Sequence, residues 1–340
     1  MRVREVTETR VTELTVADVG AAVATGSGLI WVDLDHTDER GMALLPQLFD
    51  VRSGDIEDCH IRTPVPKLHL YADHHYTAIN GLARGVDERL HFQPVKIFQK
   101  PHVVVTVLGP TSAALPADAA HHEISAVHGK LDEGFRPGTS LELITAIRRQ
   151  MMATLERLIG STASRIADFE GTILRADPVK SERLLEELFA LRHDLQTIRT
   201  SAAQAHQSYS NLLETAAMQD GMLTVDVRRV GELRQGFGHL VQITDLEREY
   251  LHEMLDLFQT RVSTELNRFV RRVTAWGTIG IAWTVIVGVY GMNFAAIPGL
   301  EASWGVLRGP RGDGHHRRRV GRVLPPARVA VSASGRIPSG

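Results

Sequence analysis

The sequence predicts an α+β protein in three parts. These are an N-terminal cytoplasmic α/β domain, an antiparallel long-helix or coiled-coil domain, and a long stalk helix that continues into one transmembrane helix. Short apolar segments separated by turn residues fill the first part, a seven-residue apolar repeat marks the second, and a charge-free run ends the third. The expected ranges are 1–112 for the α/β domain, 113–238 for the helical domain, 239–294 for the stalk with its span at 273–293, 295–304 for an outer loop and 305–340 for a disordered tail.

The composition suits a largely globular chain and argues against several functions. With 43% hydrophobic residues and a net charge of -2, the chain has no basic surplus, so we expect no nucleic-acid partner. Cys59 is the only cysteine, which excludes an internal disulfide and suits a reducing compartment. The first residues, MRVREVTETRVTEL, lack the apolar core of a signal peptide, so we expect residues 1–272 to stay in the cytoplasm.

Sequence motifs of catalysis are missing from the chain. No phosphate-binding loop, dinucleotide fingerprint or nucleophile elbow is present. Paired histidines such as His74-His75 and His121-His122 lack the partner spacing of a zinc motif. We therefore expect no enzyme.

Strand and turn patterns alternate through the first 112 residues. Residues 28–36, GLIWVDLDH, form an apolar-rich strand, and residues 42–50 are helix-like. Four more strands are expected, at 67–73, 74–85, 90–99 and 101–109. A connection rich in Pro, Gly, Ala and His follows from 109 to 138, with one helix expected at 117–131.

Long helices follow Pro137. Apolar residues step by three and four from Ile144 to Ile173, and Pro178 then stops the helix. From Leu184 to Leu212 the repeat is a strict heptad, which is typical of helices wound on one another, most simply as an antiparallel pair. Glycines at 236 and 238 are expected to interrupt the next helix.

The last helix is expected to begin near His239 and to run for about 50 residues, roughly 75 Å at 1.5 Å per residue. It continues without a turn signal into residues 273–294, which carry no charged side chain and are long enough to cross a bilayer. Arg268, Arg271 and Arg272 flank this run on its N-terminal side, so the residues before it should be cytoplasmic. The apolar stripe of this helix needs partner helices or copies of itself.

Two stripes of different chemistry follow the span. Small or polar residues recur at four-three spacing through Gly277, Ile281, Thr284, Gly288 and Gly291, and the stripe extends back through Thr274 to Asn267. Bulky aromatic residues recur every seven positions on another face, at Trp276, Trp283 and Tyr290. Each small or polar residue has an ordinary alternative: glycines pack helices closely in lipid, Thr284 can bond back to the Gly280 carbonyl, and Asn267 can be solvated. Their coincidence on one stripe favours a pore.

The end of the span resembles that of the CorA magnesium transporter family, because a charge-poor helix closes there on Tyr290-Gly291-Met292-Asn293-Phe294. Residues 55–82 resemble the family's N-terminal segment, and residues 254–280 resemble its junction of stalk and membrane helix. The resemblance covers roughly residues 28 to 298 and implies a homopentamer in the lipid bilayer that transports Mg²⁺ and also Co²⁺. The implied location is the cell membrane, the inner or plasma membrane of a bacterium.

Carried over by position, the resemblance implies the pore residues. Gly291, Met292 and Asn293 would form the outer entrance and selectivity ring. Five further residues would line the pore inward from that ring: Gly288, Thr284, Ile281, Val273 and Asn267. Magnesium sheds its water reluctantly, so a ring of neutral amide and carbonyl oxygens can hold the hydrated ion without trapping it.

Two stretches depart from the family pattern. The loop after the motif reads Ile297-Pro298-Gly299-Leu300 where the family has an acidic residue, and Glu301 stands two positions on as a candidate for attracting cations. Residues 233–239 are neutral where the family has metal-sensing carboxylates, so the regulatory metal ligands stay unassigned. Asp245 and Asp256 remain acidic, and a solvated helix face is the favoured interpretation for both.

Residues 305–340 break the pattern more severely. The family has a second transmembrane helix here, whereas this stretch holds 8 Arg, 7 Gly and 4 Pro in 36 residues. An arginine costs about 3 kcal/mol at a helix centre, so this segment should not span. We favour the hypothesis that the reading frame has shifted; the alternative is a genuine disordered basic tail.

Three functions stay open from the sequence. The first is a magnesium channel of the CorA type, the second a zinc transporter of the same superfamily, and the third a truncated membrane-anchored oligomer that conducts nothing.

Resequencing the gene across codons 300 to 310 tests the shifted frame. We expect a one- or two-base correction that restores an apolar run long enough to span, in place of the arginine-rich tail. A confirmed in-frame sequence would instead establish the basic tail.

Overall fold

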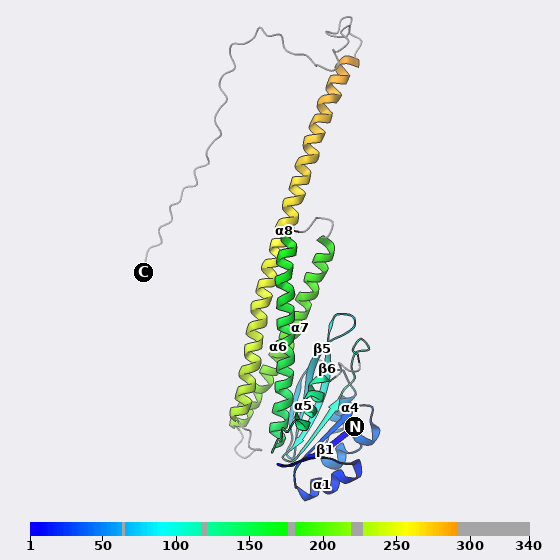
Figure 1. Ribbon diagram of the computed structural model, residues 1–340, viewed down its shortest axis with the longest axis vertical. Helices are drawn as coiled ribbons and strands as arrows, with labels where there is room; N and C mark the ends of the chain where they lie inside the picture. The colour runs from blue at the N-terminus through cyan, green and yellow to red at the C-terminus, as the bar shows by residue number, and fades with distance from the viewer. Residues whose placement is uncertain (63–64, 117–120, 176–180, 219–226, 292–340) are drawn as a thin grey trace, which may run out of the picture. The chain divides into compact units, whose positions relative to one another are not determined.

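The computed structural model describes residues 1–62, 65–116, 121–175, 181–218 and 227–291 (Figure 1). The chain divides into two compact units, Met1–Arg268 and Phe269–Gly340. Of the second unit, the helical residues 269–291 are described. The expected outer loop, 295–304, and tail, 305–340, lie outside the described residues.

A seven-stranded mixed sheet forms the middle of the N-terminal domain. Its order is β2-β1-β3-β7-β6-β5-β4; β3 pairs with β7 in parallel, and all other pairs are antiparallel. The strands are β1 Arg2–Val6, β2 Val11–Glu13, β3 Leu29–Asp35, β4 Lys67–Leu70, β5 His75–Arg84, β6 Leu90–Lys100 and β7 Val103–Leu108.

Both faces of the sheet are buried, which explains the continuous apolar run in β3. Ile30 and Val32 point to one face, Leu29 and Trp31 to the other, because successive strand side chains alternate. The first face is covered by α1 Val19–Thr25, which follows a 3-10 turn at Val16–Asp18, and by α2 Glu39–Met42, α3 Leu45–Leu48 and α4 Ser53–Cys59. The second face is covered by α5 His122–Asp132 and the first turns of α6 Ser140–Arg175.

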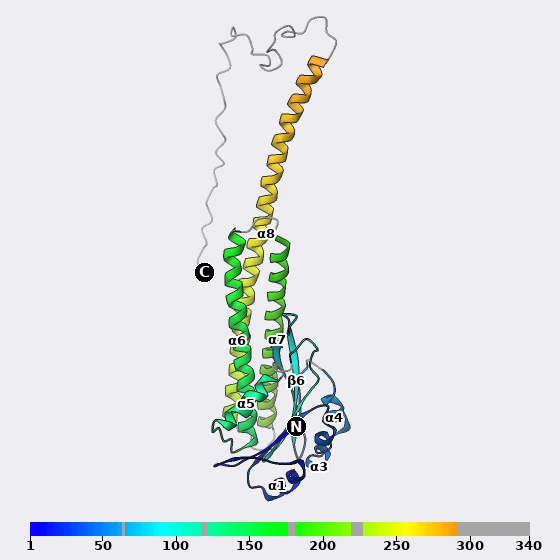
Figure 2. The same cartoon turned by 45° about the vertical axis from the view of Figure 1, so that its right-hand side comes forward.

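Three long helices form an antiparallel bundle beside the sheet. They are α6, α7 Ser181–Met218 and the first half of α8 Val227–Gly291, which lie side by side in both views (Figures 1 and 2). Their contacts make two apolar clusters, one around Ile198 and Phe237 and one around Leu188 and Leu251. The predicted helical pair is therefore a trio, with α8 as the third member.

The five strands expected between residues 28 and 109 are confirmed as β3 to β7. The helix expected at 42–50 was wrong in extent: α2 ends at Met42 and α3 occupies Leu45–Leu48, because Pro46 starts a new first turn there. The helix expected at 117–131 begins later, at His122, and residues 117–120 lie outside the described residues. The sequence patterns did not predict β1, β2, α1 or α4.

The expected interruption at Gly236 and Gly238 was wrong, because α8 is helical from Val227 through both glycines. A Cβ at Gly236 would lie 2.4 Å from Met152 Cε, and one at Gly238 would lie 3.0 Å from His206 Nδ1. These glycines let α8 approach α6 and α7 closely. The loss of helix propensity, about 1 kcal/mol per glycine, is offset by that contact.

A buried carboxylate joins α4 to the sheet. Asp58 is 5% exposed; its Oδ1 accepts from Lys67 Nζ at 2.6 Å and its Oδ2 from Tyr76 Oη at 2.6 Å. Lys96 Nζ, fully buried in β6, lies 3.5 Å from Oδ2. Burial would raise the pKa of Asp58, but the hydrogen bonds from Lys67 and Tyr76 outweigh it and hold this pKa below its usual value.

We expect Asp58→Asn to destabilise the protein by about 3 kcal/mol or more, because it leaves the Lys96 ammonium buried without its counter-ion. A carboxyl whose pKa is lowered by folding stabilises the folded state at any pH above its unfolded-state pKa, which is about 3.9. This contribution is lost as the pH falls through the folded-state pKa. Denaturant unfolding of the full chain at pH 7 and at acid pH checks both points.

The matched control is Asp50→Asn, since Asp50 is exposed. The free energy of unfolding of Asp58→Asn should depend less on acid pH than that of the unmodified protein. The control Asp50→Asn should keep the full dependence. Equal unfolding midpoints for both variants at pH 7 would contradict the structural role of Asp58.

Candidate functional site

The second half of α8 has the length and composition of a membrane span. Its best 18-residue window has a mean hydropathy of 1.5, and none of that window is buried against the described residues. Large apolar side chains there are exposed, among them Trp276 at 74% and Ile281 at 67%. A soluble monomer rarely exposes so much contiguous apolar surface, so this segment must be covered by lipid or by other helices.

The predicted small-residue stripe is open along its described length. A Cβ added at Gly277, Gly288 or Gly291 would meet nothing within 4 Å. The space that these glycines leave is therefore not filled by any of the residues that the structure describes. A close approach at this stripe needs a second helix, which is the use of glycine in helix contacts within lipid.

Threonine hydroxyls along the span bond back to the helix. Thr284 Oγ1 donates to the Gly280 carbonyl at 2.9 Å, and Thr274 and Thr278 make the same bond to the fourth preceding residue at 2.8 and 2.9 Å. The bond from Thr284 back to the Gly280 carbonyl, which was the ordinary alternative to a pore role, is thus present. It also has a consequence for ions: because the O–H is engaged by a carbonyl, the outward lone pairs of the oxygen can only accept. Water in the shell of a hydrated cation donates, so this orientation suits it.

The predicted pore residues divide into two groups. Met292, Asn293 and Glu301 lie outside the described residues. The others are on α8 and all are exposed: Asn267, Val273, Ile281, Thr284, Gly288 and Gly291. One chain forms no ring, so the assignment of these residues to a pore stays a prediction.

The neutral segment of α8 and its acidic residues have structural roles in the bundle. Leu233 and Phe237 are buried in the core of the three helices, which explains why this segment is apolar here. Asp245 pairs with Arg199 at 2.6 Å and with Arg248 at 3.0 Å, and the hydrogen bond from Arg199 is the main cause of its lowered pKa. Asp245 is thus ion-paired as well as solvated.

Potential metal ligands are scattered in the part of the chain that the structure describes. No three or more His, Cys, Asp or Glu side chains gather there in a way that could hold a metal ion. Asp256 is exposed on α8.

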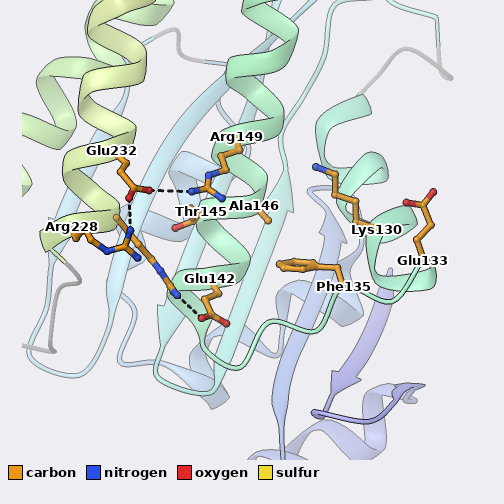
Figure 3. A pocket seen from close by; sticks show the side chains of 10 residues that line it. Lys130, Glu133, Phe135, Glu142, Thr145, Ala146, Arg149, Arg228 and Glu232 are labelled. Atoms are coloured by element: carbon orange, nitrogen blue, oxygen red, sulfur yellow. Dashed lines mark hydrogen bonds and ion pairs between the residues drawn. The ribbon is translucent and has the colours of Figure 1, made fainter.

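A cavity of about 650 Å³ lies where the first turn of α8 meets α6 and α5 (Figure 3). Three ion pairs cross it or flank it: Arg149 with Glu232 at 3.2 Å, Arg228 with Glu232 at 2.5 Å, and Arg229 with Glu142 at 2.7 Å. Sequence reasoning missed this cluster because two of its pairs join residues more than 80 positions apart. Its charges are paired with one another, and it holds the start of α8 against α6.

Comparison with known proteins identifies the family. The sequence profile of the CorA-like Mg2+ transporter protein matches residues 26–307, most of the chain. The chain belongs to the CorA-like Mg²⁺ transporter family. The match ends two residues after Gly305, where the expected tail begins.

Relatives and solved structures agree with this membership. YfjQ of Bacillus subtilis is 25% identical over 279 residues, 81% of this chain and 82% of YfjQ. The cobalt/magnesium transport protein CorA of Thermotoga maritima is 28% identical over 137 residues, 36% of this chain and 38% of that protein. The solved CorA magnesium transporter from Methanocaldococcus jannaschii shares the fold, with a TM-score of 0.71, 16% identity and coverage of 90% of this chain and 91% of that one.

Membership in the family establishes the functional class of this CorA-like protein and its location in the cell membrane. The family consists of membrane ion transporters rather than enzymes, and its members sit in the cell membrane with a soluble N-terminal domain. The predicted family and fold class are confirmed, including the N-terminal α/β domain, the long helices and one apolar helix among the described residues.

Proposed function

We propose that this CorA-like protein conducts Mg²⁺, and also Co²⁺, across the membrane through a channel-like pore made by five copies of the α8 span. Two relatives support the choice of ions: the cobalt/magnesium transport protein CorA of Thermotoga maritima and the magnesium transport protein CorA of Wolinella succinogenes. The observation that carries the pore is the exposed stripe of small and polar residues on an uncharged membrane helix.

In this pore, Asn293 and the Gly291 carbonyl form the outer ring together with Met292, and Glu301 attracts cations to the mouth. Thr284 and Gly288 line the middle, with Ile281, Val273 and Asn267 below. With five copies around the axis, each of these oxygens is repeated five times and forms a ring of neutral acceptors. Neutral acceptors bind the waters of a hydrated ion weakly enough to release it, whereas a carboxylate ring would hold the ion longer.

The membrane potential supplies the driving force. An inside-negative potential contributes about 2.3 kcal/mol per charge per 100 mV, and this is doubled for a divalent ion. The pore therefore needs no coupled reaction. Selectivity comes from the outer ring, and the apolar side chain of Ile281 narrows the path below it.

Flux into liposomes tests the pore. We expect Asn293→Ala to abolish most Mg²⁺ uptake and Thr284→Val to lower it about fivefold, because the loss of one accepted hydrogen bond to the ion's water shell costs about 1 kcal/mol. Val287→Ala, an exposed position off the stripe, is the control and should conduct normally. Flux no higher than that of protein-free liposomes in all four proteins would instead support a membrane-anchored oligomer that conducts nothing, and equal flux above that level would remove the pore residues assigned here.

Competition between ions distinguishes magnesium from zinc. We expect dye-reported Mg²⁺ uptake to be inhibited by Co²⁺ and to persist at low zinc, since a ring of hard oxygen acceptors selects magnesium-like ions over zinc, which prefers nitrogen and sulfur ligands. Zinc uptake that is insensitive to excess Mg²⁺ would replace this assignment with zinc transport.

A further inference from the structure

Arg148 in α6 is a buried cation without a counter-ion among the described residues. Its side chain is 7% exposed, and its Nε has no hydrogen-bond acceptor. The next residue, Arg149, is exposed and pairs with Glu232. A guanidinium is always charged and carries five N–H donors, so a buried one needs compensating negative charge.

Contact with an aromatic ring compensates only part of the positive charge of Arg148. The guanidinium carbon of Arg148 lies 5.4 Å from the centre of the Tyr209 ring, which in turn stacks on Phe237 at 5.9 Å. The ring face attracts a cation but accepts no N–H hydrogen bond in the plane of the guanidinium. The Tyr209 hydroxyl is itself buried without a hydrogen-bond partner. Two strong donors are therefore unused in the same region of the core.

A small cavity adjoins these groups. Its volume is about 20 Å³, and it lies between β5, α6, α7 and Phe237 of α8. Its polar lining residues are Asn80, Arg148, Ser201 and Gln204, and no acidic side chain is among the lining residues. Ser201 is only 9% exposed. A cavity of this size holds one water molecule or one monatomic ion.

We propose that this cavity binds a halide-sized anion, with chloride as the ion available in quantity. Arg148 supplies the charge, and the Ser201 hydroxyl and Gln204 amide are further donors to it. A water molecule would fit the volume but would leave the positive charge uncompensated, and a phosphate or other oxyanion exceeds the volume. The inference is independent of the proposed pore, since every residue involved lies in the Met1–Arg268 unit.

The proposed anion lies at the junction of the sheet and the helical bundle. The cavity is lined by the sheet through Ile79, Gly81 and Leu82 and by all three bundle helices. An occupied site therefore stabilises the junction between the N-terminal sheet and the helical bundle. Halide concentration should shift the stability of the folded chain by mass action.

Thermal unfolding of the full chain in detergent tests the site. We compare sodium chloride with sodium gluconate at equal ionic strength and expect a Tm higher by about 3 °C in chloride. Arg148→Gln should remove this difference. Arg149→Gln, its exposed neighbour, should retain it, because screening of surface charge does not depend on the identity of the anion.

A second measurement covers the case in which Arg148→Gln fails to fold. The chloride-35 NMR line of the wild-type protein should be broadened, and bromide should reverse the broadening in a saturable way; Arg149→Gln should behave identically. Equal Tm values in the two salts, loss of the chloride effect in Arg149→Gln, or absence of saturable broadening would each overturn the site.

Discussion

An apolar stripe along a helix must lie against something apolar, and α8 carries such a stripe through 65 residues. Its first half meets this requirement within the chain, where Leu233, Phe237, Leu251 and Leu255 are buried against α6 and α7. Beyond Phe258 no described part of the chain covers the stripe: Leu266 is 59% exposed and Phe269 62%. The need to cover the second half is what makes this a membrane protein, because lipid and other copies of the helix are the apolar surfaces that remain.

The helix α6 connects the parts of the soluble unit. Its first turns, with Leu143 and Ile147, pack on the sheet; Leu155 and Ile159 pack between α7 and α8; and Ile166 closes the far cluster. Because one helix contributes to three cores, a change at any of them is transmitted as a shift of the same rigid element. The Arg148 cavity lies at the first transition along this helix, between the sheet and the bundle.

The chemistry of the span depends on avoiding charge. The threonine hydroxyls are satisfied by their own helix, and the glycines leave their carbonyls accessible to a neighbouring helix or to water. An uncharged helix inserts at low cost, and its outward oxygens still accept hydrogen bonds from hydrated ions. The same residues thus meet the requirements of the bilayer and of a divalent cation.

Local sequence patterns were sufficient to predict the elements that depend on interactions between residues close in sequence. The strands from β3 to β7, the long helices and the span follow from alternation, heptad spacing and absence of charge, because backbone geometry alone sets those periods. The motif ending in Asn293 gave the family for a similar reason, since its residues are adjacent in sequence. The short N-terminal elements were missed because β1 and α4 are stabilised by partners far along the chain, such as Asp132 for Arg4 and Lys96 for Asp58.

Tertiary structure alone decided the roles of several residues that the sequence left ambiguous. Gly236 and Gly238 were expected to break a helix, yet they lie inside one, because contact with Met152 and His206 outweighs their poor helix propensity. Arg148 and Arg149 are indistinguishable as neighbours in sequence. A rotation of 100° around the helix places one in the core without a counter-ion and the other on the surface beside Glu232, since burial depends on what packs against each face.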